Sequence, residues 1–279
     1  LVDTYARYGM LMEAQAVFDK LMFRDVISWT ALISGYAENG QTDKALECLK
    51  HMQDSGIPPT DVTYVCTLKA CGSIRAKFKG AQIHVDIEKR GFFANIVVGN
   101  ALIDMYAKCG SLTKARDVFH MLPFRNLVSW TTLIGGYAQH EQGQEALNCF
   151  EQMKSHGLSP DAITYACCLK ACGSIGAIDK GKEMHDLILC RGLLEKDIVL
   201  ATALVDMYAK CDVLDKAHEI LQEVTMRDVV SWNTLVSGYA QKGQCEEALN
   251  SFERMLCESL CPDVVTFIFT LKACGSKLA

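Results

Sequence analysis

Three copies of one stretch divide the chain into thirds, and this recurrence restricts the fold more than any other feature. The copies begin as VISWTALISGYA at Val26, LVSWTTLIGGYA at Leu127 and VVSWNTLVSGYA at Val229. A period of roughly 100 residues is too long for one helical repeat, because such repeats usually have about 20 to 50 residues. Each third must therefore contain several smaller repeats.

Two further recurring stretches supply the subdivision. One contains LKACGS, beginning at Leu68, Leu169 and Leu271; the other contains ALIDMYAKC at Ala101 and ALVDMYAKC at Ala203, with LVDTYAR at the start of the chain. Placed end to end, these stretches predict complete repeats at 26–60, 61–95, 96–126, 127–161, 162–197, 198–228 and 229–263, with partial repeats at 1–25 and 264–279. Because the chain opens and stops inside a repeat, we expect it to be a piece of a longer protein.

Each repeat has the pattern of a helical hairpin. In 26–60, apolar residues from Trp29 to Tyr36 recur at helical spacing, Gly40 supplies a turn, and a second apolar set ends at Met52. Two antiparallel helices of this kind can bury their apolar faces only against neighbouring repeats. We therefore predict one array over 1–279, an all-α solenoid of helix-turn-helix repeats coiled into a right-handed superhelix.

The same pattern predicts where the middle turns and the two walls of the solenoid lie. In repeats 61–95 and 162–197 the turn between the helices is expected at Gly72 and Gly173. First helices should line one wall and second helices the other.

Composition excludes several classes of function. A formal net charge of −5 argues against a general binder of polyanions. The fourteen cysteines recur in register, as at Cys71, Cys172 and Cys274, so we expect buried packing residues in a reducing compartment. The chain has no CxxC pair and no histidine at finger spacing, and no apolar run of roughly 20 residues. We expect no metal, no cofactor, no membrane contact and no small-molecule substrate.

At this point the repeats resemble a known family. The alternation of SWNTLVSGYAQKGQCEEALNSFERM, TYACCLKACGSIGAIDKGKEMH and ALIDMYAKCGSLTKARDVF is similar to the PLS subclass of plant pentatricopeptide repeat proteins. Three distinct motif types recur in one order over the whole chain, which makes the resemblance specific. It assigns P motifs to 26–60, 127–161 and 229–263, L motifs to 61–95 and 162–197, and S motifs to 96–126 and 198–228, with a partial S at 1–25 and a partial L at 264–279.

The resemblance implies sequence-specific binding of single-stranded RNA at about one base per repeat. It further implies a mitochondrial or chloroplast location, selection of sites for C-to-U RNA editing, and editing cofactor proteins that bind the L motifs. An alternative function is a peptide-binding or protein-binding scaffold of the tetratricopeptide type, which shares helical hairpins and a concave face.

Catalysis by this chain finds no support in the sequence. The family's deaminase domain would need an HxE motif and CxxC-type clusters for its zinc, and neither occurs. His84 and His185 repeat in register, so we interpret them as packing or capping residues. We therefore do not expect this chain to be an enzyme.

Two columns of polar residues are the candidates for base recognition. Numbered from the first residue of each repeat, position 5 is polar in the P and S motifs but Val65, Ala166 and Ile268 in the L motifs, and the last position is usually Asp or Asn. Such side chains offer directed donors and acceptors to base edges. The candidates are Thr30, Thr60, Asn100, Asn126, Thr131, Asp161, Thr202, Asp228, Asn233 and Asp263.

Helix capping is the competing explanation for the last column, since Asp and Asn are favoured immediately before a helix. Against it we weigh the Ser or Thr at position 3, such as Ser28 and Thr63, which is itself expected to cap. The family's two-residue code then implies guanine for Thr131 with Asp161 and for Thr202 with Asp228, uracil for Asn233 with Asp263, and a pyrimidine for Asn100 with Asn126. The code gives no base for the L motifs, and the 5′ end of the RNA would lie toward Leu1.

Two further columns are predicted to hold the rest of each nucleotide. Position 2 would sandwich bases by apolar contact, although this column could equally be core; its members are Ile27, Val97, Val128, Val199 and Val230. Cations on the same sector of the first helix could neutralise phosphate; these are Lys69, Lys170 and Lys272 in L motifs, and Arg7, Lys108 and Lys210 in S motifs. The S-motif cations have an aspartate four residues earlier, so a surface ion pair is the alternative.

Overall fold

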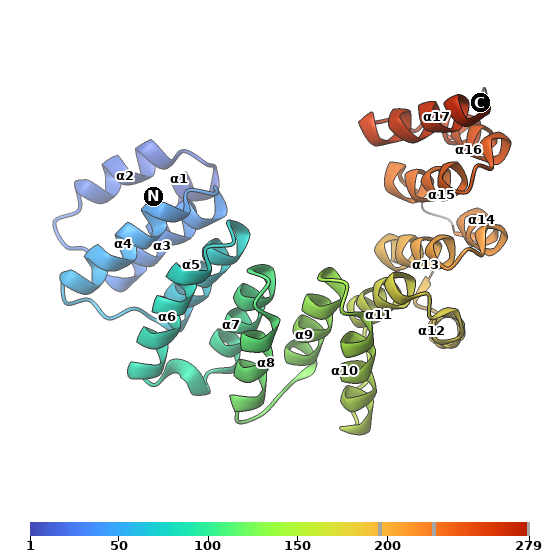
Figure 1. Cartoon of the computed structure of the whole chain (residues 1–279). Helices are drawn as coiled ribbons and strands as arrows, with labels where there is room; N and C mark the ends of the chain where they lie inside the picture. Colours follow the sequence, from blue (N-terminus) through green and yellow to red (C-terminus); the bar gives the residue numbers. More distant parts are fainter. Residues whose placement is uncertain (195–196, 225–226, 278–279) are drawn as a thin grey trace. The chain divides into compact units, whose positions relative to one another are not determined.

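The computed structural model describes residues 1–194, 197–224 and 227–277, and within them the chain is a succession of helices joined by short loops (Figure 1). The helices are α1 (Val2–Arg7), α2 (Leu11–Asp19), α3 (Val26–Glu38), α4 (Thr42–Asp54), α5 (Asp61–Ser73), α6 (Lys77–Lys89), η1 (Phe92–Ala94), α7 (Ile96–Lys108), α8 (Leu112–Met121), α9 (Leu127–Gln139), α10 (Gly143–Ser155), α11 (Ala162–Ile175), α12 (Ile178–Cys190), α13 (Ile198–Lys210), α14 (Leu214–Glu223), α15 (Val229–Gln241), α16 (Cys245–Cys257) and α17 (Val264–Lys277). The predicted all-α class of helix-turn-helix repeats is confirmed.

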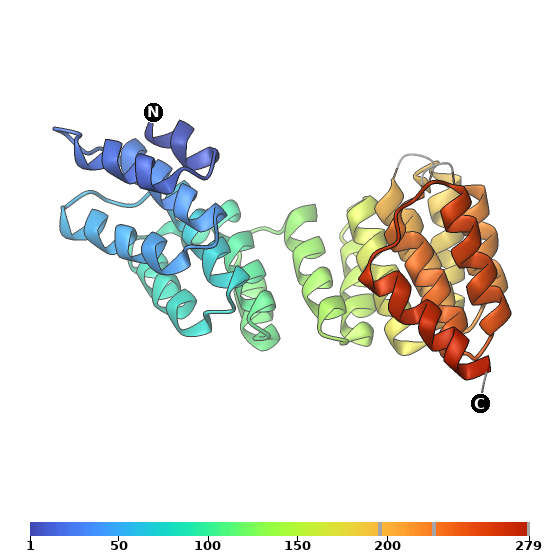
Figure 2. The same cartoon turned by 90° about the horizontal axis from the view of Figure 1, so that it is seen from above.

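The chain forms two compact units, Leu1–Gly136 and Tyr137–Ala279, with the boundary inside α9. In the first unit α1, α3, α5 and α7 pack in that order, and in the second unit α11, α13, α15 and α17 do the same. The second helices α2, α4, α6, α12, α14 and α16 each pack against the first helix of the same hairpin and against the next first helix. Figure 2 shows the helices of the second unit, yellow to red, standing side by side. First helices therefore form one layer of each unit, and second helices form the other.

Apolar residues of both helices fill the space between the layers. The tryptophans Trp29 and Trp130 are buried, and each lies edge-on against a phenylalanine of the preceding hairpin, Phe18 or Phe119, with ring centroids 4.6 Å apart. Edge-to-face pairs of this kind add stability beyond the area that they bury. The recurring tryptophan is thus a core residue that joins consecutive hairpins.

Glycines inside first helices allow close approach between hairpins, and this corrects the predicted turns. Gly72 and Gly173 lie within α5 and α11, not between helices. A Cβ at Gly72 would lie 3.2 Å from Lys108 Cδ, so the missing side chain makes room for the next hairpin. The turns fall slightly later, at the left-handed residues Arg75 (φ 55°) and Gly176 (φ 66°).

The cysteines are free thiols, and in the recurring register Cys71 and Cys172 are buried, whereas Cys274 is half-buried. Burial raises the pKa of Cys71 to about 11 and that of Cys172 to about 12, so both are neutral near pH 7. Across residues 1–194, 197–224 and 227–277, no helix combines the length and apolar character that a membrane crossing requires.

Candidate functional site

The last residue of each repeat is the N-cap of the next first helix. Its side chain accepts a hydrogen bond from a backbone N–H in the first turn, as Asp25 does from Ser28 at 2.8 Å and Asp228 does from Ser231 at 2.8 Å. The same bond is made by Thr60, Asn95, Asn126, Asp161, Asp197 and Asp263. Capping is therefore a general property of this column.

The Ser and Thr residues at position 3 are not the N-caps of the first helices, so the prediction that they cap these helices in place of the last residue is wrong. Ser28 and Ser231 occupy the third position inside the helix, and their hydroxyls accept from the backbone N–H of the capping Asp at 3.0 and 3.1 Å. The two residues thus satisfy each other's amides in a capping box. Asp25 and Asp228 provide the cap, and the serines complete it.

Capping does not prevent the last residue from meeting position 5. Asn233 Nδ2 donates to Asp263 Oδ1 at 2.9 Å, and Asn100 Nδ2 donates to Asn126 Oδ1 at 3.4 Å. The structure therefore brings these two predicted pairs together, and the same oxygen that caps the helix receives the position-5 amide.

The hydroxyls of Thr30 and Thr60 do not bond each other. Both lie near Thr63 Oγ1, at 2.9 and 3.1 Å, so Thr63 bridges this predicted pair. In the described part of the chain, the structure thus links position 5 and the last residue of this repeat through a third side chain.

In each of these two pairs, one polar atom of the last residue's side chain is not used by the cap or by the position-5 amide. Within the described residues the hydrogen bonds that Asp263 and Asn126 accept from neighbouring side chains all end on Oδ1, so neither Asp263 Oδ2 nor Asn126 Nδ2 has a side-chain partner. The backbone N–H of Thr266 holds the pKa of Asp263 below its ordinary value of 3.8, so this carboxylate is ionised near pH 7. Asp263 therefore offers an acceptor to a ligand, whereas Asn126 offers a donor.

The position-2 column is exposed, so the alternative that it belongs to the core is wrong. The exposed fractions are 76% for Ile27, 56% for Val97, 56% for Val128, 66% for Val199 and 57% for Val230. In contrast, Trp29, two residues beyond Ile27, is only 4% exposed. Apolar side chains repeated on the outside of the first helices are available to contact a ligand.

In the second compact unit these columns line a single groove of about 770 Å³ across α11, α13 and α15. It combines the position-2 side chains, a position-5 threonine with its last-position aspartate, and an L-motif lysine. These lining residues are Ile163, Val199, Val230, Thr202, Asp228 and Lys170. The groove therefore places apolar, hydrogen-bonding and cationic groups on one surface.

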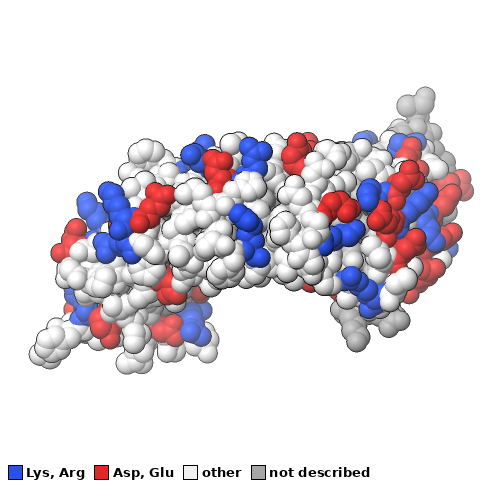
Figure 3. Space-filling view, turned by 90° about the horizontal axis from the view of Figure 1, so that it is seen from below, with Lys and Arg blue, Asp and Glu red and all other residues white. Residues whose placement is uncertain are grey.

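The predicted cations fall into two groups. Those of the S motifs form ion pairs with the aspartate four residues earlier, with Arg7 Nε 3.0 Å from Asp3, Lys108 Nζ 2.8 Å from Asp104 and Lys210 Nζ 2.7 Å from Asp206. The L-motif residues Lys69, Lys170 and Lys272 are exposed, and Lys69 and Lys170 have no ion pair within the described residues. On the face drawn in Figure 3, charges of both signs are interspersed. Lys69 and Lys170 are thus the better-placed cations for an anionic ligand.

The remaining predicted pair spans the two compact units. Thr131 is half-buried on α9 in the first unit. Asp161 accepts from the backbone N–H of Thr164 at 2.8 Å in the second unit. Each residue therefore has the local setting of its column.

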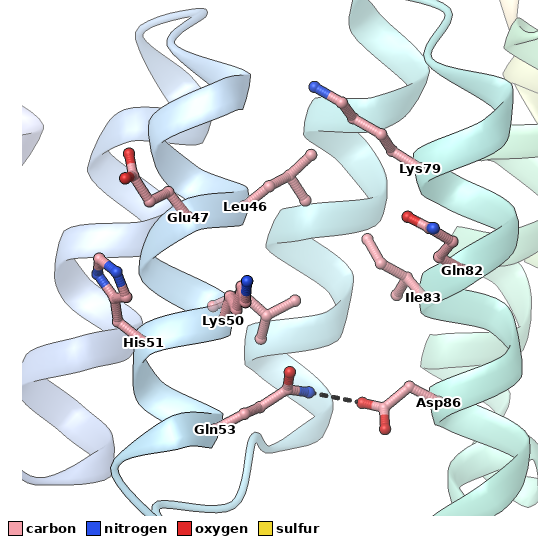
Figure 4. A pocket seen from close by; sticks show the side chains of 10 residues that line it. Leu46, Glu47, Lys50, His51, Gln53, Lys79, Gln82, Ile83 and Asp86 are labelled. Atoms are coloured by element: carbon pink, nitrogen blue, oxygen red, sulfur yellow. Dashed lines mark hydrogen bonds between the residues drawn. The ribbon is translucent and has the colours of Figure 1, made fainter.

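A second groove, of about 560 Å³, lies between the second helices α4 and α6 of the first unit (Figure 4). Gln53 Nε2 donates across it to Asp86 Oδ2 at 2.7 Å, and Lys79, which also lines it, is paired with Asp43. Leu46, Leu49 and Ile83 form its apolar lining. None of the repeated polar columns reaches this groove, so we do not assign it the main function.

The sequence predicts only a capping role for the position-3 column, to which Thr63 and Thr266 belong, although both residues contact a position-5 side chain. Thr266 Oγ1 donates to Asn233 Oδ1 at 2.6 Å. A signal is present in the sequence, because the position-3 residues that follow the apolar position 5 of the L motifs are Val98 and Leu200. Position 3 is thus polar only where the preceding position 5 is polar.

Helical hairpins whose exposed contact residues recur on the first helices define an α-solenoid repeat protein. The PPR repeat family matches residues 24–73, 125–174 and 227–276, and the PPR repeat matches 100–127 and 199–229. The chain therefore belongs to the pentatricopeptide repeat family.

Curated relatives come from Arabidopsis thaliana. The chain is 38% identical over 277 residues to pentatricopeptide repeat-containing protein At2g33680, covering 99% of this chain and 38% of that protein. It is 35% identical to the chloroplastic protein At1g11290, covering 98% and 34%, and 36% identical to the mitochondrial protein At3g09040, covering 98% and 26%. The chain thus spans well under half the length of these relatives.

Solved structures share the fold. The crystal structure of the pentatricopeptide repeat protein PPR10 in complex with an 18-nt psaJ RNA element superposes with a TM-score of 0.82 at 20% identity, covering 98% of this chain and 41% of that one. The crystal structure of PPR10 from maize gives a TM-score of 0.61 at 20% identity, covering 98% and 45%.

Proposed function

We propose that this chain binds single-stranded RNA in a sequence-specific manner, with its P and S repeats each reading about one base. The observation that carries the proposal is the groove of the second compact unit, which gathers Val199, Val230, Thr202, Asp228 and Lys170 on one surface. Apolar side chains there would hold a base by its faces, polar side chains would read its edge, and the cation would contact phosphate. A fold relative was solved with RNA bound.

The leftover atom of the last residue suggests how a base would be read. Asp263 Oδ2 accepts only, so it suits uracil or guanine, which carry a hydrogen on the ring nitrogen of the Watson–Crick edge. Asn126 Nδ2 donates, so it suits cytosine or adenine, whose ring nitrogen is an acceptor. This chemistry agrees with uracil for Asn233 with Asp263, and it favours cytosine as the pyrimidine for Asn100 with Asn126.

The remaining assignments follow the family. In this proposal Thr131 with Asp161 and Thr202 with Asp228 select guanine, and the L motifs select no base. Thr30 with Thr60 also faces RNA. The position-2 residues Ile27, Val97 and Val128 hold bases by apolar contact, as proposed for Val199 and Val230.

The wider role is also proposed from the relatives. Several carry chloroplastic or mitochondrial in their names, which supports an organellar location. The P, L and S order supports the PLS subclass and site selection for C-to-U editing. Apolar position-5 residues such as Val65 and Ala166 are suited to binding an editing cofactor protein. The proposal assigns recognition, not catalysis, to this chain.

The test exchanges Thr202 for Asn and keeps Asp228. We expect selection from a randomised RNA pool to change at one nucleotide, from guanine to uracil, by about 1–3 kcal/mol in binding free energy. Thr113→Asn on the second helix α8 is the matched control, because Thr113 is exposed outside the first-helix surface. If the wild-type chain enriches no RNA sequence, the proposal is wrong and the peptide-binding scaffold becomes the better explanation.

A further inference from the structure

We propose that Thr266 is a third specificity-determining residue, which positions the Asn233 side chain for the nucleotide read by Asn233 and Asp263. This inference rests on the proposed function, because it concerns the same surface. Thr266 would not touch the base; it would fix which atoms of Asn233 meet it.

The contacts of Thr266 tie three side chains together. Its side chain is fully buried, and Oγ1 lies 2.6 Å from Asn233 Oδ1 and 2.9 Å from Asp263 Oδ1. The same oxygen accepts from the backbone N–H of Asp263 at 3.1 Å. Asn233 is itself only 7% exposed, so its amide has little freedom to find other partners.

These contacts determine the orientation of the Asn233 amide. An ionised carboxylate can only accept, so the atom of Asn233 that faces Asp263 must be the nitrogen, at 2.9 Å. The oxygen then faces Thr266, whose hydroxyl donates to it. One N–H of Asn233 remains for a ligand, and a buried oxygen left without a partner would destabilise this orientation.

The fixed orientation explains a preference for uracil over cytosine. Beside the ring N–H that Asp263 Oδ2 would accept, uracil presents its O4 carbonyl, which suits the remaining N–H of Asn233. Cytosine presents its N4 amine at that place, so two donors would face each other. Thr266 would therefore strengthen the discrimination between the O4 carbonyl of uracil and the N4 amine of cytosine.

A second junction lacks this third contact and provides a contrast. At Asn100 and Asn126 the position-3 hydroxyl of Ser129 donates to Asn126 Oδ1 at 3.0 Å. Asn100 Oδ1 is buried and has no hydrogen-bond partner within the described residues. The hydroxyl contact to position 5 is thus a feature of particular junctions, and it recurs where Thr63 Oγ1 lies 2.9 Å from Thr30 Oγ1.

The experiment compares Thr266→Val with Thr266→Ser. Binding is measured to two RNAs that differ only by uracil or cytosine at the nucleotide assigned to Asn233. Loss of one hydrogen bond should lower the uracil-to-cytosine affinity ratio by about threefold to tenfold in Thr266→Val, and Thr266→Ser should keep the ratio. Thr270→Val is the matched control, because Thr270 is also buried on α17 but bonds only the backbone oxygen of Thr266.

The uracil-to-cytosine affinity ratio separates a positioning role of Thr266 from a role in folding, because a loss of folded protein weakens binding to both RNAs equally. If Thr266→Val does not fold, as judged by circular dichroism, Thr63→Val tests the same kind of contact at Thr30 and Thr60. The measurement is then the preference of the wild-type chain for one base at that repeat, which Thr63→Val should reduce. If the wild-type chain prefers uracil and Thr266→Val has the same uracil-to-cytosine affinity ratio, this inference is overturned and the proposed function is not. A wild-type chain without RNA binding overturns the proposed function and this inference together.

Discussion

Asn233 Nδ2 lies 2.9 Å from Asp263 Oδ1, a contact that joins the first helix of one repeat to the start of the next across 30 residues of sequence. The same carboxylate oxygen accepts the backbone N–H of Thr266 at 2.8 Å. Capping and base reading are therefore not alternatives at this residue. One oxygen stabilises the helix and holds the amide, and the other remains for a ligand.

Asp263→Asn should change the preferred base from uracil to cytosine. Asn keeps an oxygen for the cap, since Asn and Asp cap about equally well, but it replaces the free acceptor by a donor. We expect a shift of about 1–3 kcal/mol in relative binding free energy, measured with RNAs that differ at one nucleotide. Asp215→Asn, an exposed first-turn acid of α14, should leave the preference unchanged. Continued selection of uracil by Asp263→Asn would contradict the role given to Oδ2.

The fold class could be predicted because helical periodicity is local, whereas several site features depend on the neighbouring repeat. Gly72 has the local pattern of a turn, because its partner, Lys108, belongs to the next hairpin and cannot be recognised from the sequence nearby. A column of Val and Ile has the same pattern whether it is core or exposed, so the exposure of Ile27 required coordinates. The sequence around Thr266 predicts only a cap, because its second contact, with Asn233, crosses between repeats.

Lys69 and Lys170 should contribute to RNA affinity without affecting base preference. Each phosphate contact to a single strand changes the slope of log K against log salt by about 0.7, so Lys69→Ala with Lys170→Ala should flatten the slope by up to about 1.4. Lys108→Ala with Lys210→Ala is the matched pair, and it should change the slope less, because these lysines are bound to Asp104 and Asp206. A loss that depends on the RNA sequence would argue against phosphate contact.

Gly35→Ala should destabilise the first compact unit. A Cβ at Gly35 would lie 2.4 Å from Ala6 Cβ and 3.2 Å from Ala6 Cα, and the backbone of α1 cannot move aside as a flexible side chain could. Overpacking of this kind costs about 1–3 kcal/mol, measured as a lower denaturation midpoint. Gly275→Ala is the control: its Cβ would meet nothing within 4 Å, so it should gain about 0.5–1 kcal/mol of helix stability. An equal gain of stability in Gly35→Ala and Gly275→Ala would show that α1 and α3 do not pack this closely.

Ser55→Glu should stabilise the first compact unit by giving Trp29 a partner. Trp29 Nε1 is buried without a hydrogen bond in the described residues, whereas Trp232 Nε1 donates to Glu258 Oε2 at 2.9 Å. Ser55 ends α4 as Glu258 ends α16, with φ −78° and ψ 3° against φ −80° and ψ 7°. A glutamate at 55 should therefore reach the indole in the same way.

Satisfying one buried donor is worth about 1 kcal/mol, so the urea denaturation midpoint of Ser55→Glu should rise. Arg24 stands in register with Arg227, which pairs with Glu258, and should add a small ion-pair contribution. Ser55→Ala measures the loss of the bond from Ser55 Oγ to the His51 carbonyl and serves as the reference. A midpoint for Ser55→Glu no higher than that of Ser55→Ala would mean that the carboxylate stays in solvent and that the Trp29 indole remains without a partner.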